Sequence, residues 1–404
     1  MKAVQWDGKY TMKNSKKKKR RKKRKIGFFI FEVIILILLL GGLFVYAKVN
    51  DGFRNIGSGT LFSSANSNSN SSDPNQNTDN VVINEEAAVD KVMSGYTNIL
   101  LVGIDARSAN DFNYSNSDTM IVCSINNNNG EVRLVSIYRD TLLNTNPSTD
   151  NYTKANDAYM QGSITQCLSM INTNLDLSIT QYMVVDFTAL STLVDDIGGI
   201  DITLSEEETV HVNNYCKETS QVTGKSYEDL PKEAGTYTLN GVQAVSYSRI
   251  RYTKGYDMKR TQRQRLVIKK IVEKARSQGL SAISSVINDV FPLCKTNISN
   301  SMLIKMATQM IGYYQIVDTT GFPFYYKSGS SSINSECLVP ITLETNVTEL
   351  HEFLFDDSTY LPSSTVKSYS QTMEDLSGFT IADLDTATSS SNIAAAGSES
   401  DSIR

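Results

Sequence analysis

The chain has 404 residues, of which 40% are hydrophobic, so it is long enough for one large or two modest folded domains. Its two histidines argue against a His-rich metal site and a Ser/His/Asp triad, and its five cysteines contain no CxxC pair of the kind that zinc ribbons use. Residues 1–48 hold 14 Lys and Arg against 2 Asp and Glu, whereas the rest of the chain holds 25 against 41, which predicts that the two parts occupy different compartments.

The N-terminal part is predicted to be a membrane anchor. Residues 26–47 are apolar except for Glu32, and a helix of this length spans ~30 Å, the hydrocarbon thickness of a bilayer. Ten consecutive positive charges at Lys16–Lys25 precede it, so we expect residues 1–25 to be a basic cytoplasmic tail and the C-terminal mass to lie outside the cell. Nucleic-acid binding or nuclear import is the alternative for the basic run. We favour the topology signal because the run adjoins the span, which is also too long for a usual cleaved signal peptide.

Composition divides the remainder of the chain into three parts. Residues 48–84 are a predicted polar spacer, because Ser63–Asn80 contains mostly Ser, Asn, Asp and Gln and cannot bury enough apolar surface to fold. Residues 85–355 are the predicted folded domain. Residues 356–404 are a predicted C-terminal extension that is largely disordered after Ile381, where Ser, Ala, Asp and Thr prevail.

The folded domain has the pattern of a mixed α/β fold. Asn98–Gly103 and Thr119–Ile125 are apolar, β-branched strands, and Asn126–Gly130 (NNNNG) is a hairpin turn into a strand at Glu131–Ile137. Further strands are predicted at 182–185, 200–204, 321–326 and 337–341, and helices at 85–93, 164–175, 188–197, 240–247, 259–278, 281–290 and 300–313. Strands interleaved with helices predict a central sheet covered on both faces.

Candidate site residues first appear beside the first two strands. Asp105 and Arg107 follow directly on Asn98–Gly103, and ligand groups gather at the carboxyl ends of strands in such folds. Asp118 comes just before the next strand. Two carboxylates, together with phosphate oxygens and waters, form a usual Mg²⁺ shell. A salt bridge within a turn is the alternative for Asp105 and Arg107, and an ordinary turn or cap is the alternative for Asp118.

Two cations come next along the chain. Arg139 stands where a predicted strand ends, and Lys154 opens the following patterned segment. Either side chain is equally consistent with a solvated surface charge.

The densest cluster of basic residues lies at 249–265. Seven of the 25 basic residues beyond position 48 fall within these 17 positions: Arg249, Arg251, Lys254, Lys259, Arg260, Arg263 and Arg265. Arg249 and Arg251 would share one face of an extended stretch, and Arg260, Arg263 and Gln264 share one face of a helix. Guanidinium groups bind phosphate bidentately, so the cluster predicts a phosphate-bearing ligand. A solvated helix face is the alternative. We do not expect a nucleic-acid ligand, because the domain is predicted to lie outside the cell and is strongly acidic.

The cysteines are assigned to packing or to a disulfide. Cys123 and Cys167 occupy apolar-patterned positions and are predicted to pack in the core. Cys216, Cys294 and Cys337 lie in loop-like segments, where an extracytoplasmic location permits a disulfide. The sequence does not say which pair forms it, and we choose Cys216–Cys294 as the expectation.

Four ordered motifs give the chain a resemblance to a known family. They are NILLVGIDAR, NSDTMIVCSI, LVSIYRDT with KAND, and LNGVQAVSYSRIRYTKGYDMKRTQRQR, between about Asn98 and Gln278. With them, the chain resembles the LytR–CpsA–Psr family of bacterial cell-envelope proteins. The resemblance implies a three-layer α/β/α extracytoplasmic domain with a central mixed sheet. It also implies transfer of a glycopolymer, such as teichoic acid or capsule, from a polyprenyl-pyrophosphate carrier to peptidoglycan, in the cell membrane of a Gram-positive-type bacterium.

The resemblance also implies roles for individual residues. Asp105 and Asp118 match the family's aspartates for Mg²⁺, or Mn²⁺ in its place. The phosphate-binding arginines match Arg107, Arg139, Arg249, Arg251 and Arg260, and further polar positions match Lys154, Asp257, Arg263 and Gln264. Catalysis is assigned to the two aspartates with Arg107, Arg139, Arg249 and Arg251, without a named general base.

Two departures from the family pattern and three rival functions remain. Asn116 stands where many members have Arg, and Tyr138 stands where many have Pro, which affects a phosphate contact and the loop before Arg139. The rivals are a pyrophosphatase of the cell envelope, which uses water as the acceptor, and a regulatory protein that binds the polyprenyl pyrophosphate without turnover. A structural envelope protein that binds acidic polymer is a third possibility.

Overall fold

The computed structural model describes residues 80–105, 112, 115–253, 256–279, 285–329 and 336–390. The predicted tail, membrane span and most of the spacer lie outside these residues, as does Arg107. Within the described ranges, no helix combines the length and the apolar composition that a membrane crossing requires.

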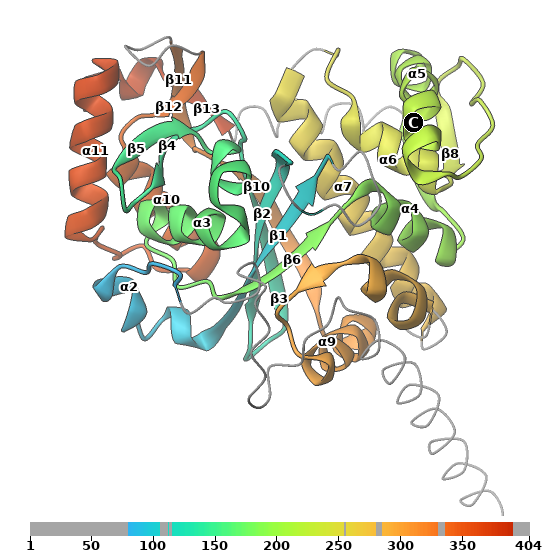
Figure 1. Cartoon of the computed structure of the whole chain (residues 1–404), viewed down its shortest axis with the longest axis horizontal. Coiled ribbons are helices and arrows are strands. Elements are labelled where there is room, and N and C mark those ends of the chain that lie inside the picture. Colours follow the sequence, from blue (N-terminus) through green and yellow to red (C-terminus); the bar gives the residue numbers. More distant parts are fainter. Residues whose placement is uncertain are drawn as a thin grey trace, which may run out of the picture. The chain divides into compact units, whose positions relative to one another are not determined.

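A six-stranded mixed sheet forms the centre of the fold (Figure 1). Its order is β10–β3–β2–β1–β6–β9, with bounds β1 Tyr96–Ile104, β2 Ser117–Asn126, β3 Glu131–Ile137, β6 Gln181–Val185, β9 Lys295–Thr296 and β10 Gln315–Phe322. The pairs β1–β6 and β3–β10 are parallel and the other three pairs are antiparallel. The predicted turn Asn126–Gly130 joins β2 to β3, which confirms that hairpin.

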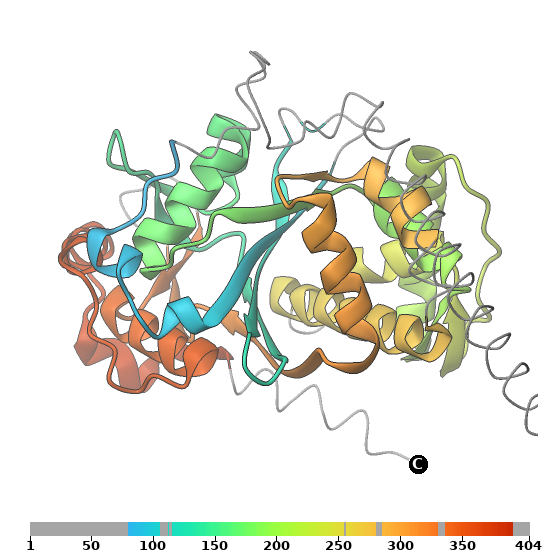
Figure 2. The same ribbon diagram turned by 90° about the horizontal axis from the view of Figure 1, so that it is seen from below.

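Helices lie on both faces of this sheet, as Figures 1 and 2 show from two directions. Side chains of a strand alternate between faces. In β1, Leu100 and Val102 enter the main hydrophobic core, whereas Ile99 and Leu101 line a cavity on the opposite face. The core face is covered by α3 (Asp157–Leu175), α10 (Leu343–Phe355) and α11 (Ser364–Ser377), and the cavity face by α7 (Tyr256–Gln278) and α9 (Asn300–Gly312). The mixed α/β fold predicted from the sequence is thus confirmed.

A smaller packed unit adjoins the cavity face. It contains α4 (Phe187–Asp196), β7 (Ile200–Leu204), α5 (Glu206–Thr223), β8 (Gly235–Leu239) and α6 (Gly241–Arg249), which share a second hydrophobic cluster. The strand predicted at 200–204 exists, but it pairs with β8 outside the central sheet. A side chain at Gly241 would collide with the Ser191 carbonyl, so this glycine permits the close packing of α6 on α4.

The remaining elements are short. They are α2 Glu85–Ala88, η1 Met93–Gly95, β4 Leu142–Asn146, β5 Asn151–Lys154, η2 Val286–Val290, η3 Phe291–Leu293, β11 Tyr325–Gly329, β12 Cys337–Pro340, η4 Ile381–Thr386 and β13 Thr388–Ser389.

The folded region continues beyond the predicted domain boundary at residue 355. Val366 and Met373 of α11 belong to the main core, and β13 pairs with β11. The disorder predicted from Ile381 onward is therefore wrong for residues 381–390, because backbone pairing with β11 orders a segment whose composition is polar.

The expected Cys216–Cys294 disulfide is also wrong. All five cysteines are free, and these two lie in separate hydrophobic clusters. Burial raises the pKa of the Cys216 thiol to about 11 and that of Cys294 to about 12, so both stay protonated and unreactive at neutral pH. Cys167 packs in the main core as predicted, whereas Cys123 faces the cavity.

A buried carboxylate joins distant parts of the chain. Asp176 ends α3 in the left-handed conformation (φ 50°) and is fully buried. Its Oδ2 accepts a 2.7 Å bond from the Ser363 amide, its Oδ1 accepts a 2.6 Å bond from the Ser363 hydroxyl, and Asn84 Nδ2 donates to the same Oδ1. The start of the folded region and α11 are thus tied to α3 through one side chain.

We expect Asp176→Ala to lower the free energy of unfolding by about 3 kcal/mol, because it leaves several buried donors without an acceptor. Asp356→Ala is the matched control. Asp356 ends α10 in the same conformation (φ 56°), but its side chain is 65% exposed, so its ion pair with Arg133 is expected to contribute less than about 1 kcal/mol. Chemical denaturation of both variants measures the difference, and equal losses would show that only the backbone strain matters.

Candidate functional site

The site lies at one edge of the central sheet. Ile104 pairs with Ser117 across β1 and β2, and Gly103 pairs with Val185 across β1 and β6. Asp105, just after β1, and Asp118, at the start of β2, are therefore brought to the same edge. β3 is antiparallel to β2 and also ends there, which brings Arg139 to this edge.

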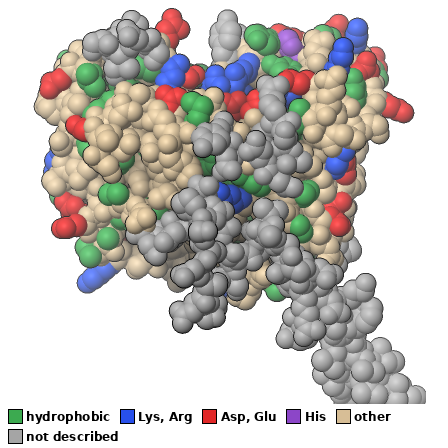
Figure 3. All heavy atoms as spheres, in the orientation of Figure 1, with side chains coloured by type: hydrophobic (Ala, Val, Ile, Leu, Met, Phe, Trp, Pro, Cys, Tyr) green, Lys and Arg blue, Asp and Glu red, His purple; other side chains and the backbone are tan. Residues whose placement is uncertain are grey.

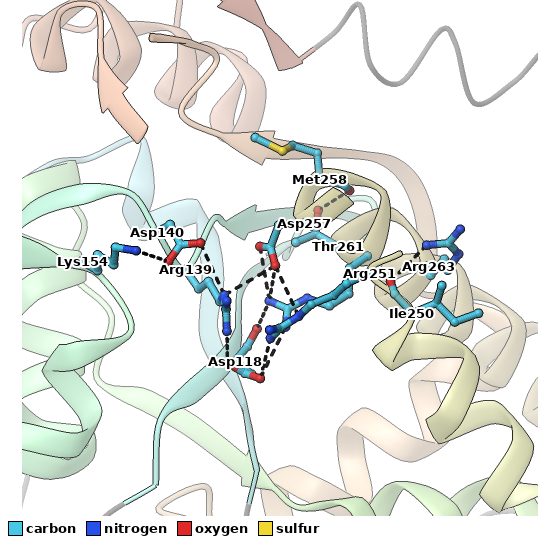
Figure 4. A network of polar contacts seen from close by, with 11 residues as sticks. Asp118, Arg139, Asp140, Lys154, Ile250, Arg251, Asp257, Met258, Thr261 and Arg263 are labelled. Atoms are coloured by element: carbon cyan, nitrogen blue, oxygen red, sulfur yellow. Dashed lines mark hydrogen bonds and ion pairs between the residues drawn. The ribbon is translucent and has the colours of Figure 1, made fainter. Parts of the chain in front are cut away.

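Three guanidinium groups converge on the Asp118 carboxylate, and Figure 4 labels two of them, Arg139 and Arg251. Its Oδ1 lies 2.9 Å from Arg139 Nη1, and its Oδ2 lies 3.0 Å from Arg251 Nη2 and 3.4 Å from Arg260 Nη1. These arginines come from the turn after β3, the segment between α6 and α7, and the first turns of α7. Segments more than 100 residues apart in the sequence therefore meet at one acid.

A second acid completes the cluster. Asp257 Oδ1 lies 3.1 Å from Arg260 Nη2, 3.5 Å from Arg139 Nε and 3.7 Å from Arg251 Nε. Three cations thus face two carboxylates, which leaves one positive charge in excess. Figure 3 shows Lys and Arg side chains gathered with Asp and Glu side chains at the top centre of this face.

The charges are unequally exposed to solvent. The Arg260 side chain is only 2% exposed, whereas that of Arg251 is 33% exposed. Burial lowers the pKa of Arg260 despite the two nearby aspartates. Burial also acts to raise the pKa of Asp118, but Arg260, Arg139 and Arg251 together hold it below its ordinary value. The Asp118 carboxylate is therefore ionised at neutral pH. The more exposed Arg251 can exchange its carboxylate partner for an anion from solution.

Lys154 and Asp140 extend the cluster on the side of Arg139. Lys154 Nζ lies 3.1 Å from Asp140 Oδ1, and Asp140 Oδ2 lies 3.5 Å from Arg139 Nε. The chain of contacts Lys154–Asp140–Arg139 is visible in Figure 4.

Arg249 lies on the same cavity but has different partners. As the last residue of α6, it donates to Glu218 Oε2 at 2.8 Å and to Thr219 Oγ1 at 2.9 Å. Its guanidinium carbon lies 4.6 Å from the Phe187 ring centroid and 5.3 Å from that of Tyr215. The predicted common face of Arg249 and Arg251 is wrong, because the helix ends between them and directs the two side chains to different partners.

Arg263 points away from the cluster (Figure 4). It donates to Glu208 Oε1 at 2.9 Å, to the Ile250 carbonyl at 3.1 Å and to Thr253 Oγ1 at 2.7 Å, and its side chain is 2% exposed. These bonds fix the segment that carries Arg251 against α5 and α7. The predicted shared face of Arg260, Arg263 and Gln264 is only partly realised, since Gln264 lines the cavity and Arg263 does not.

A long apolar cavity of about 980 Å³ begins at the arginine cluster. Its mouth contains Asp105, Asp118, Arg139, Arg249, Arg251 and Arg260, and its interior is lined by side chains such as Ile121, Cys123, Leu134, Val267, Ile271, Leu303, Met306 and Met310. The cavity thus lies between the sheet and helices α7 and α9. Such an arrangement is suited to a ligand with an anionic head and a long apolar tail.

The donor chemistry of the two acids fits Mg²⁺. Asp105 and Asp118 both face the cavity mouth, and carboxylate oxygens are the ligands that this hard cation prefers. No group of three or more His, Cys, Asp or Glu suited to a metal occurs among the described residues, so bound phosphate oxygens and water would complete the shell.

Sequence reasoning missed Phe187, Tyr215, Glu218 and Tyr252 at this site. Tyr215 and Glu218 lie on α5, which was not predicted as a helix. Its start carries a capping box between Ser205 and Glu208, a signal visible in the sequence as Ser-x-x-Glu. The aromatic residues have no local pattern of their own, since only the tertiary fold brings them beside Arg249 and Arg251.

The fold thus places a cluster of arginines and aspartates beside an apolar cavity at one edge of the central sheet. The sequence profile of the LytR_cpsA_psr family matches residues 59–335, more than half of the chain, so this chain belongs to that family. The resemblance identified from the four motifs is thereby confirmed.

Two relatives and one solved structure illustrate the likeness. Biofilm regulatory protein A of Streptococcus mutans is 30% identical over 225 residues, which are 53% of this chain and 52% of the relative. Polyisoprenyl-teichoic acid–peptidoglycan teichoic acid transferase TagU of Enterococcus faecalis is 31% identical over 211 residues, 52% of this chain and 64% of the relative. The chain thus spans about half to two thirds of these relatives' length. Protein gbs0355 of Streptococcus agalactiae has a TM-score of 0.56 at 24% identity, covering 70% of this chain and 94% of that one, and supports the fold alone.

The low pKa of Asp118 predicts how stability depends on pH. A carboxylate whose folded-state pKa lies below the unfolded value of ~3.9 stabilises the protein fully above that value. This contribution is lost as the pH falls through the folded-state pKa. We expect Asp118→Asn to lower the free energy of unfolding by about 2 kcal/mol at pH 7, because three guanidinium groups lose their common partner.

The difference between the wild-type chain and Asp118→Asn should shrink as the pH falls below about 4. Denaturant unfolding between pH 7 and pH 3 measures it. A difference that stayed constant over this range would mean that the neighbouring arginines do not stabilise the ionised form of the Asp118 carboxylate.

Proposed function

We propose that this chain is a membrane-anchored phosphotransferase that moves a glycopolymer from a polyprenyl-pyrophosphate carrier to peptidoglycan. The observation that carries the proposal is the convergence of three arginines at the mouth of a long apolar cavity. The similarity to the Enterococcus faecalis relative, named a polyisoprenyl-teichoic acid–peptidoglycan teichoic acid transferase, supports the choice of donor and acceptor.

The arginines would bind the diphosphate. Its oxygens replace the Asp118 and Asp257 carboxylates as partners of Arg139, Arg251 and Arg260, and such charge-assisted bonds favour an anion with several oxygens. In the reaction, a peptidoglycan sugar hydroxyl attacks the phosphorus next to the glycan. A new O–P bond forms, the P–O–P bridge breaks, polyprenyl phosphate leaves, and the hydroxyl proton passes to solvent. Charge develops on the leaving phosphate, where fixed guanidinium groups stabilise it.

The apolar cavity would hold the isoprenoid tail. Its lining from β1, β2, β3, α7 and α9 is nearly continuous in aliphatic side chains, and removing such a tail from water is favourable by roughly 25 cal/mol per Å² of buried surface. The tail thereby positions the diphosphate at the mouth, beside the arginine cluster.

Mg²⁺, or Mn²⁺ in its place, is proposed at Asp105 and Asp118. When bound, the cation would neutralise charge on the diphosphate oxygens. The anchor at residues 26–47 is proposed to keep the domain outside the cell, next to the bilayer that contains the carrier.

A coupling assay tests this function. The full-length chain in lipid nanodiscs is incubated with a polyprenyl-pyrophosphate oligosaccharide, a peptidoglycan fragment and Mg²⁺, and the coupled product is measured by mass spectrometry. We expect product that requires Mg²⁺, and a loss of about 30-fold in rate for Arg251→Gln, since a charge-assisted hydrogen bond contributes roughly 2 kcal/mol.

Arg276→Gln is the matched control, because Arg276 lies in the last turn of α7, away from the cluster at the start of this helix, and donates to the Ile311 carbonyl. Release of free oligosaccharide phosphate without the acceptor would instead identify a pyrophosphatase. Binding of the carrier without any turnover would identify a regulatory protein, and either result would contradict the proposal.

A further inference from the structure

An exposed tyrosine stands at the cavity mouth, directly after Arg251 in the chain. The Tyr252 side chain is 72% exposed, yet it belongs to the cavity lining. We propose that Tyr252, with His211 and Tyr215, forms a stacking shelf for the sugar that is joined directly to the diphosphate. This inference rests on the proposed function and specifies which part of the substrate these residues recognise.

The three rings come together from two segments. His211 and Tyr215 are four residues apart on α5 and therefore share one face of that helix. The His211 and Tyr252 rings lie 6.4 Å apart at an angle of 32°, so their faces are tilted in the same general direction. Tyr215 in turn lies 5.3 Å from the guanidinium carbon of Arg249. The shelf is thus continuous with the positively charged mouth.

The backbone that presents Tyr252 is held on both sides. Arg251, before it, is bonded to Asp118 at 3.0 Å, and Thr253, after it, is buried and accepts a 2.7 Å bond from Arg263. Arg263 is itself bonded to Glu208 at the start of α5. An exposed ring on such a fixed segment loses little conformational entropy when a ligand packs against it, which favours binding. The buried Arg263 therefore helps to hold in place the segment that carries Tyr252.

The chemistry of the shelf matches a sugar. One face of a pyranose ring presents C–H groups that pack on aromatic rings, while its hydroxyl groups need acceptors at the edge. α5 supplies such acceptors beside the rings, since the Glu207 side chain is 62% exposed and that of Glu218 is 40% exposed.

The position of the shelf also matches the order of groups in the substrate. A polyprenyl-pyrophosphate saccharide has its lipid on one side of the diphosphate and its first sugar on the other. With the lipid in the cavity and the phosphates on Arg139, Arg251 and Arg260, the sugar must leave the mouth within a few ångströms of these guanidinium groups. Tyr252 is adjacent to Arg251 and faces solvent, whereas the Arg139 side of the cluster presents the Lys154–Asp140 ion pair.

Paired ligands test the inference. The full-length chain in nanodiscs is titrated with geranylgeranyl pyrophosphate and with the same lipid pyrophosphate carrying N-acetylhexosamine, and both dissociation constants are measured by calorimetry. We expect Tyr252→Ala to weaken binding of the glycosylated ligand about tenfold and that of the sugar-free ligand less than twofold. Tyr252→Trp should restore the tighter binding, because it restores the ring face.

Tyr313→Ala is the control for loss of an exposed tyrosine, since Tyr313 ends α9 away from the mouth and should leave both constants unchanged. The shelf is refuted if Tyr252→Ala weakens both ligands equally, or neither. If the wild-type chain binds neither ligand, the proposed function itself fails, so the two failures are distinguishable.

Discussion

The site depends on one electrostatic arrangement, the Asp118 carboxylate held among three guanidinium groups. Arg139, Arg251 and Arg260 would repel one another without an anion between them, and Asp118 supplies that anion with contacts of 2.9–3.4 Å. The carboxylate thus keeps the arginines in position at a partly buried edge of the sheet. A diphosphate, which carries more charge and more oxygens than a carboxylate, is the kind of ligand for which such a preformed arrangement is suited.

The fold produces this arrangement through strand geometry. β1, β3 and β6 end at the edge where β2 begins, so residues that flank four strands become neighbours. Alternation along the same strands then gives one face to the main core and the other to the cavity. The sheet therefore supports the main core on one face and the cavity on the other, and helices α7 and α9 close the cavity. The charged mouth combines the edge of the sheet with Arg249, Arg251 and Arg260 from α6, α7 and the segment between them.

Local patterns in the sequence predicted much of this. The strands β1, β2 and β3, the turn between them and the long helix α7 follow from apolar periodicity and turn residues, and Asp118, Arg139, Arg251 and Arg260 do meet as the proposed convergence requires. Arg107 lies outside the described residues. The sequence could not distinguish Arg263 from Arg260, because both lie on α7 at helical spacing and only the tertiary partners differ.

Other features depend on long-range contacts that leave no local pattern. The ordering of residues 381–390 arises from pairing with β11, and Arg249 turns to Glu218 because α6 ends against α5. The shelf at Tyr252 likewise arises only when α5 is placed beside the segment between α6 and α7. Composition suggested disorder after Ile381 and allowed a solvated basic face at 249–265. Composition does not show which distant segment of the chain packs against a given one.

The most direct measurement is an experimental structure of the full-length chain with polyprenyl pyrophosphate and Mg²⁺. We expect the diphosphate oxygens to contact Arg139, Arg251 and Arg260 in place of the Asp118 carboxylate, with the isoprenoid tail between the sheet and helices α7 and α9. A diphosphate bound elsewhere, with the three guanidinium groups still on Asp118, would contradict it.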